Sequence, residues 1–131
     1  MKRLLIIFFV LSMIGFASWS ASQNKEDQSN NELSLNFPYK LYPTENMWTF
    51  IKLDTRNGRM WQVQYSVKGS EYRFETTLNE EKLANDSIPG RFELYPTQNI
   101  YNFVLLDRIK GYAWQVQWSM DVENRAILPI Y

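Results

Sequence analysis

The chain has 131 residues, 16% of them aromatic, and its 14 Lys and Arg residues balance 14 Asp and Glu residues. It contains neither His nor Cys, which excludes disulfides, thiol nucleophiles, the commonest general base and the commonest zinc ligands. The balanced charge gives no electrostatic support for nucleic acid or an anionic membrane as a partner.

The first 20 residues have the layout of a secretory signal peptide. Lys2 and Arg3 form a short positive start, residues 4–16 form an apolar run, and small residues follow at Ala17, Ser18 and Ser20. The apolar run is too short to span a membrane comfortably. We therefore predict that residues 1–20 are a signal peptide and that the mature chain is exported to the periplasm, the cell surface or the medium, without stable membrane insertion. A retained N-terminal anchor is the alternative.

A polar segment follows at residues 21–36. It holds almost no apolar side chains, so it cannot bury enough surface to offset the entropy of ordering, and we predict a disordered polar tether. Removal of Lys2 and Arg3 with the signal peptide leaves 12 basic against 14 acidic residues, so the mature chain is slightly acidic. Residues 37–131 remain as one small domain rich in aromatic side chains.

Residues 37–131 contain an internal duplication. Residues 41–67 align with residues 94–120 at a constant offset of 53, and 14 of the 27 aligned positions are identical. We predict repeat 1 at residues 37–78, a polar linker at residues 79–89 and repeat 2 at residues 90–131.

Each repeat is expected to hold four β-strands. The expected strands of repeat 1 are residues 39–42, 47–54, 60–67 and 71–78, with counterparts in repeat 2 that begin at residues 92–95 and end at residues 125–130. The last pair aligns only when the offset is shifted to 52. The prediction is an all-β fold made by tandem duplication of an antiparallel four-stranded unit, with about eight strands in a sandwich-like or barrel-like arrangement with pseudo-twofold symmetry. Two sheets side by side, like propeller blades, are the less favoured alternative because their edges would stay exposed.

The loop of each central hairpin keeps one glycine, Gly58 or Gly111, beside Asp54 or Asp107. We predict that the glycine takes the left-handed conformation and that the aspartate accepts hydrogen bonds from turn amides. Asp54 as a calcium ligand or catalytic acid is the alternative, and it is disfavoured because no carboxylate cluster accompanies it. The sequence predicts no metal site and no cofactor.

Pairing across each loop sorts the hairpin side chains onto two faces. The first face holds Phe50, Trp61 and Val63 with their copies, and it is expected to be the core, with Trp61 and Trp114 equally buried. The second face is apolar near the turn and neutral-polar farther away, so it is expected to be partly covered.

Amide and indole side chains supply the candidate binding residues. Both glutamine pairs of the second face are kept between the copies, and the outer tryptophans could stack on a sugar ring or a peptide. The candidates are Gln62, Gln64, Gln115, Gln117, Trp48 and Trp118. The competing interpretations are ordinary solvation of the glutamines or their hydrogen bonding to neighbouring loops, and core packing of the tryptophans.

The pattern Leu-Tyr-Pro-Thr-x-Asn, an aromatic residue, Leu-Asp, a glycine turn and Trp-Gln-Val-Gln resembles a tandem repeat of small exported, mostly uncharacterised Bacteroidota proteins. The likeness is most specific at residues 61–64 and 114–117. It implies an envelope or secreted location and carries over no activity and no catalytic residue. Asp86-Ser87-Ile88 is similar to the short O-glycosylation signal of that phylum, although an unmodified linker is favoured.

We therefore expect a non-catalytic binding or interaction module of the bacterial envelope whose partner is a protein or a glycan. A structural, assembly or inhibitor protein that acts through protein–protein contacts is the alternative. A glycoside-cleaving enzyme is less favoured, because the only acids duplicated in the aligned repeat are Asp54 and Asp107, which the turns already explain. The sequence leaves the oligomeric state open.

Overall fold

A computed structural model describes residues 37–131 of the chain. The predicted signal peptide at residues 1–20 and the predicted tether at residues 21–36 lie outside the described residues. Within the described part, the helical segments are 3-10 turns, and none is long and apolar enough to cross a membrane.

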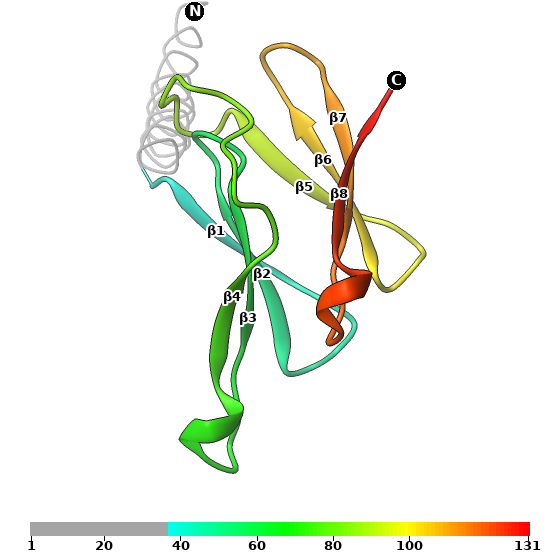
Figure 1. Cartoon of the computed structure of the whole chain (residues 1–131). Coiled ribbons are helices and arrows are strands. Elements are labelled where there is room, and N and C mark those ends of the chain that lie inside the picture. The colour runs from blue at the N-terminus through cyan, green and yellow to red at the C-terminus, as the bar shows by residue number, and fades with distance from the viewer. Residues whose placement is uncertain (1–36) are drawn as a thin grey trace, which may run out of the picture. The chain divides into compact units, whose positions relative to one another are not determined.

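Within residues 37–131, eight strands form two antiparallel four-stranded sheets, and in each sheet the strands lie in chain order (Figure 1). The first sheet contains β1 (Tyr39–Pro43), β2 (Thr49–Asp54), β3 (Met60–Gln64) and β4 (Phe74–Thr77). The second sheet contains β5 (Phe92–Pro96), β6 (Asn102–Asp107), β7 (Ala113–Gln117) and β8 (Ala126–Ile130). The 3-10 turns η1 (Ser70–Tyr72) and η2 (Val122–Asn124) precede the last strand of each sheet. The all-β class with two four-stranded units is confirmed.

The predicted strand register is confirmed in both repeats. Phe50 faces Val63 across the first hairpin, and Phe103 faces Val116 across the second. The last strands keep the shifted offset of 52, because Trp61 faces Thr77 where its copy Trp114 faces Pro129. The fold therefore repeats down to individual backbone pairs.

Both hairpin turns also form as predicted. Gly58 has a φ of 78° and Gly111 has a φ of 76°, in the left-handed region that a residue without a Cβ adopts freely. Their amides donate to the carbonyls of Asp54 and Asp107, at 3.0 and 2.8 Å.

The hydrophobic core lies between the sheets and takes opposite faces from the two repeats. From the first sheet it takes three residues of the second face, Ile51, Leu53 and Met60. From the second sheet it takes the first face and the matching residues of β5, namely Phe92, Leu94, Phe103, Leu105, Val116 and Trp118. The sheets thus pack in a sandwich-like way with unlike faces in contact.

Two expectations about symmetry and burial need correction. A pseudo-twofold axis would bring equivalent faces together, whereas here the second face of repeat 1 meets the first face of repeat 2. The first face was expected to be core in both repeats, but it is core only in repeat 2. Trp61 therefore lies on an open face, whereas Trp114 packs against the core. The physical reason is that two copies stacked in the same sense each present a different face to the interface.

The linker at residues 79–89 is packed against the first sheet rather than merely spanning a gap. Asn79 accepts a hydrogen bond from the Met60 amide at 2.7 Å and donates to the Gly58 carbonyl at 3.0 Å. The Leu83 amide donates to the Asn57 carbonyl at 2.8 Å, and Leu83 lies over Gly58. The linker therefore closes the turn end of the first sheet.

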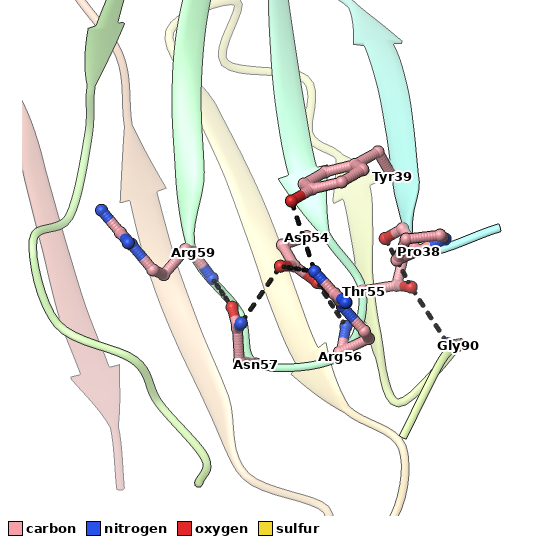
Figure 2. Close-up of polar contacts among 8 residues, drawn as sticks. All are labelled: Pro38, Tyr39, Asp54, Thr55, Arg56, Asn57, Arg59 and Gly90. Carbon is pink, nitrogen blue, oxygen red and sulfur yellow. Dashed lines mark hydrogen bonds and ion pairs between the residues drawn. The ribbon is translucent and has the colours of Figure 1, made fainter. Parts of the chain in front are cut away.

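Thr55 joins the beginnings of the two sheets (Figure 2). Its hydroxyl donates to the Pro38 carbonyl at 2.8 Å and accepts from the Gly90 amide at 3.0 Å. Its carbonyl accepts from the Phe92 amide at 2.8 Å. This residue fixes where β5 begins relative to the end of β2.

Candidate functional site

The first face of the first sheet is open and rich in aromatic side chains. This surface, called the aromatic face below, consists of Tyr39, Leu41, Trp48, Phe50, Trp61, Val63 and Tyr65. Leu41 is 60% exposed, whereas its copy Leu94 is 2% exposed. Tyr65 is 41% exposed, whereas its copy Trp118 is 2% exposed. A set of side chains that forms core in one repeat is therefore solvent-facing in the other, and clustered exposed apolar side chains of this kind mark interaction sites.

The rings of the aromatic face contact one another. The centroids of Trp48 and Tyr65 are 5.2 Å apart, and those of Phe50 and Tyr65 are 6.2 Å apart. Tyr39 meets Trp61 edge to face at 6.3 Å. These separations lie in the range of favourable aromatic pairs, so the surface is ordered before any partner binds.

Cations cover part of this face. The Lys52 ammonium lies 4.7 Å from the Trp61 ring centroid and also contacts the Glu75 carboxylate at 2.6 Å. The Arg59 guanidinium lies 5.2 Å from the same ring. Such cation–π contacts occupy the ring surface of Trp61, while Glu75 balances the charge of Lys52.

Asp54 is committed to the turn beside this face (Figure 2). Its two carboxylate oxygens accept four hydrogen bonds, from the amide, Nε and Nη2 of Arg56 and from Nδ2 of Asn57, at 2.8–3.0 Å. Burial opposes ionisation of Asp54, but the hydrogen bonds from Arg56 outweigh it and hold its pKa below the usual value. The carboxylate is therefore a turn cap, as predicted, with both oxygens already engaged.

Asp107 caps the second turn with a cation from elsewhere in the chain. It accepts from the amides of Ile109 and Lys110 at 2.9 and 3.1 Å, and from Nε and Nη2 of Arg91 at 3.0 and 2.6 Å. Arg91 also pairs with Asp86. Burial again works against the charged form, and the Arg91 hydrogen bonds overcome it, so the pKa of Asp107 is also lowered.

Sequence reasoning did not identify Arg91. The signal was available at position 109, where isoleucine replaces the arginine that serves Asp54 in repeat 1. A buried carboxylate that loses its local cation needs another one.

The six candidate binding residues do not converge on one surface. Gln62 is fully buried between the sheets, where Nε2 donates to the Met120 sulfur at 3.6 Å and Oε1 has no partner among the described residues. Gln64 donates to the Tyr72 carbonyl at 3.2 Å. Trp118 is core, with its indole N–H on the Ile100 carbonyl at 3.0 Å. Among the six, only Trp48 belongs to the aromatic face.

The remaining two glutamines lie on the second face of the second sheet. Gln115 donates to Asn102 Oδ1 at 2.9 Å, and Gln117 donates to the Asn124 carbonyl at 2.8 Å. Around Gln115 is an open apolar surface, called the aliphatic face below, made of Tyr95, Val104, Leu106, Ala113, Leu128 and Ile130. Leu128 and Ile130 are 51% and 53% exposed. The two-sheet stack therefore ends in two different apolar faces.

Among residues 37–131, no group of three or more acidic side chains is placed to hold a metal ion. No family model, no curated protein and no solved structure matches the chain. The likeness to exported Bacteroidota repeats thus stays a prediction.

Proposed function

We propose that the chain is an exported, non-catalytic interaction module of the bacterial envelope that binds a protein partner through the aromatic face. The observation that carries this proposal is the exposure of side chains such as Leu41 and Tyr65, whose copies form the core in repeat 2. Removing such a surface from water is favourable by roughly 25 cal/mol per Å² of apolar area, so a complementary surface would be held there.

The cations on the aromatic face favour a protein partner over a glycan. A sugar ring that stacked on Trp61 would compete with Lys52 and Arg59 for the ring surface. A protein surface can instead pack beside these rings and pair with the charged heads at the rim.

The non-catalytic part of the proposal rests on the state of the duplicated acids. Asp54 and Asp107 each hold several turn and guanidinium hydrogen bonds and have lowered pKa values. A general acid needs the opposite shift.

The exported part of the proposal rests on the charged start and the apolar run of residues 2–16. N-terminal sequencing of protein recovered from the envelope is expected to begin between Ser18 and Ser22. Recovery of intact Met1 on a membrane-embedded protein would contradict export by cleavage.

Photo-crosslinking in expressing cells tests the binding surface. A photoreactive amino acid at position 41 of the aromatic face is expected to give a discrete protein adduct. The matched control is position 88, where Ile88 is 44% exposed in the linker before β5 and lies outside the aromatic face. No adduct at position 41, or the same adduct at position 88, would show that this face binds nothing specific.

A further inference from the structure

We propose that the partner of the aromatic face is the aliphatic face of a second copy of this chain, so that chains stack head to tail. This inference rests on the proposed function, because it assigns the partner of the same surface. The interface between the two sheets of one chain supplies the template. There the second face of the first sheet packs against the first face of the second sheet. The aromatic face is the first face of the first sheet, and the aliphatic face is the second face of the second sheet. The two open faces are therefore copies of the two surfaces that pack together inside the chain.

The aromatic face retains the side chains that make this contact in repeat 2. Four of its residues are identical to their copies, namely Leu41 with Leu94, Phe50 with Phe103, Trp61 with Trp114 and Val63 with Val116. Three more, Tyr39, Trp48 and Tyr65, stay aromatic in both copies. The side chains with which repeat 2 packs against the first sheet thus have close copies on the exposed aromatic face.

The aliphatic face has close copies of the repeat 1 side chains against which repeat 2 packs. Tyr95 and Leu106 are identical to Tyr42 and Leu53, and Val104 replaces Ile51. Gln115 holds the place of Gln62, which the second sheet buries completely. Gln115 is exposed in the single chain, whereas its copy Gln62 is buried. If the same contact forms between chains, Gln115 is buried in it as Gln62 is buried within the chain.

The main departures from the template are compatible with it. The oppositely charged Lys52 and Glu75 stand where repeat 2 has Leu105 and Ile127. Ala113 stands where repeat 1 has Met60, so the aliphatic face is smaller at the position where the aromatic face carries longer side chains. The ammonium of Lys52 is already paired with Glu75 at 2.6 Å. Covering it would therefore not leave an uncompensated charge.

The template also fixes the register of the stack. Within one chain the Phe92 amide donates to the Thr55 carbonyl at 2.8 Å. The copies of these residues are Tyr39 and Arg108. In the proposed stack the Tyr39 amide of one chain approaches the Arg108 carbonyl of the next.

Because the two faces differ, the interface is heterologous, and every chain added presents a fresh aromatic face or a fresh aliphatic face. Such contacts close into a ring if the rotation between subunits allows it and otherwise continue as a filament. Complementation between variants can separate this arrangement from a symmetric dimer.

Sedimentation of the processed chain, purified after export, and of two variants provides the test. Leu41→Lys places a charge on the aromatic face, and Leu128→Lys places one on the aliphatic face; both side chains are exposed, so the fold should persist. Wild type is expected to form assemblies that grow with concentration, and each variant alone is expected to be monomeric. An equimolar mixture is expected to give a heterodimer, because each variant keeps one intact face. Ile88→Lys, the control, lies in the linker outside both open faces and is expected to assemble like wild type.

Several results would overturn the proposal. A monomeric wild type at every concentration, a mixture that stays monomeric, or assembly of Leu128→Lys alone would each exclude the head-to-tail contact. Thermal melts check folding, and Tyr65→Lys with Ile130→Lys is the replacement pair if either first variant unfolds. The identity of the protein crosslinked at position 41 distinguishes the proposed function from self-stacking. A crosslink to a second copy of this chain supports both proposals. A crosslink to another protein supports the binding surface but overturns self-stacking, and the absence of an adduct overturns both.

Discussion

Asp54 and Asp107 occupy equivalent turns but use different cations. Arg56, two residues beyond Asp54, supplies the guanidinium locally, whereas Asp107 takes it from Arg91 in the segment before β5. The Arg91 and Asp107 side chains are almost completely buried. Breaking one partner of a buried pair leaves an uncompensated charge, so the second turn depends on a contact between distant parts of the chain.

Asp107→Asn should therefore lower the melting temperature, and the loss should depend on pH. The folded pKa of Asp107 lies below its unfolded value, so its contribution is fully present above the unfolded value, about 4, and disappears as pH falls through the folded value. The difference in melting temperature between wild type and Asp107→Asn should shrink as the pH is lowered through this range. Thermal melts across pH measure it, with Asp121→Asn, at the exposed residue just before η2, as control. A difference that is independent of pH would contradict the ion-pair account.

Gly58 and Gly111 share a conformation but not a neighbourhood. A Cβ at Gly58 would lie 3.0 Å from Leu83 Cδ1 and 3.2 Å from Leu83 Cβ, whereas a Cβ at Gly111 would meet nothing within 4 Å. Both alanine variants should lose about 1–3 kcal/mol through positive φ. Gly58→Ala should lose about 1 kcal/mol more because Leu83 must move. Denaturant unfolding of the two variants tests this, and equal losses would mean that the linker yields freely.

Gln62 is one of the candidate binding residues that the sequence offers, and the structure buries it completely. Its Oε1 has no partner among the described residues, and an unsatisfied buried polar group costs about 1–3 kcal/mol. Gln62→Met should therefore raise the free energy of unfolding by about 1 kcal/mol or more. Gln115→Met, at the exposed copy, should change it little. A destabilised Gln62→Met would show that the amide is satisfied in solution by water or by a shifted neighbour.

At the scale of strands and sheets, alternation in the sequence predicted which side chains share a face but not which face is buried. Phe50, Trp61 and Val63 are as apolar as Ile51, Leu53 and Met60, so a period of two fits either choice. Strand existence, register and turn residues are local properties and were predictable. The choice of face depends on how the next sheet stacks, which no local pattern encodes.

Matched leucines give the sharpest test of the opposite-face packing. Leu94→Ala should lose about 2–5 kcal/mol, and its exposed copy Leu41→Ala much less. The asymmetry should reverse for the second face, where Leu53→Ala in repeat 1 should cost more than Leu106→Ala in repeat 2. Chemical denaturation of the four variants measures the pattern. If repeat 2 were the more sensitive copy on both faces, the stacking order would be wrong.

At the scale of the whole molecule, the candidate site follows from the duplication rather than from any motif. The six predicted glutamine and tryptophan residues do not share one surface, because Gln62 and Trp118 are buried in the contact between the repeats. The aromatic face could be recognised only once that contact was known. The duplication predicted two similar units, but it does not show which copy of each face is buried and which is exposed. That depends on how the two sheets pack together.

The shared core leads to a last prediction about cooperativity. The fully buried apolar residues come from both repeats and lie between them, so neither repeat has a core of its own. A chain as short as one repeat, without disulfides, is only marginally stable even when its hydrophobic core is complete. Residues 37–131 should unfold in a single transition, whereas residues 37–89 or 90–131 alone should lack a cooperative melt at low concentration. Mixing the two fragments should restore part of the transition, because the Thr55 contacts with Gly90 and Phe92 and the buried faces can reform. Circular dichroism melts of the three polypeptides measure this, and a cooperative transition in either isolated fragment would show that one sheet is stable without its neighbour.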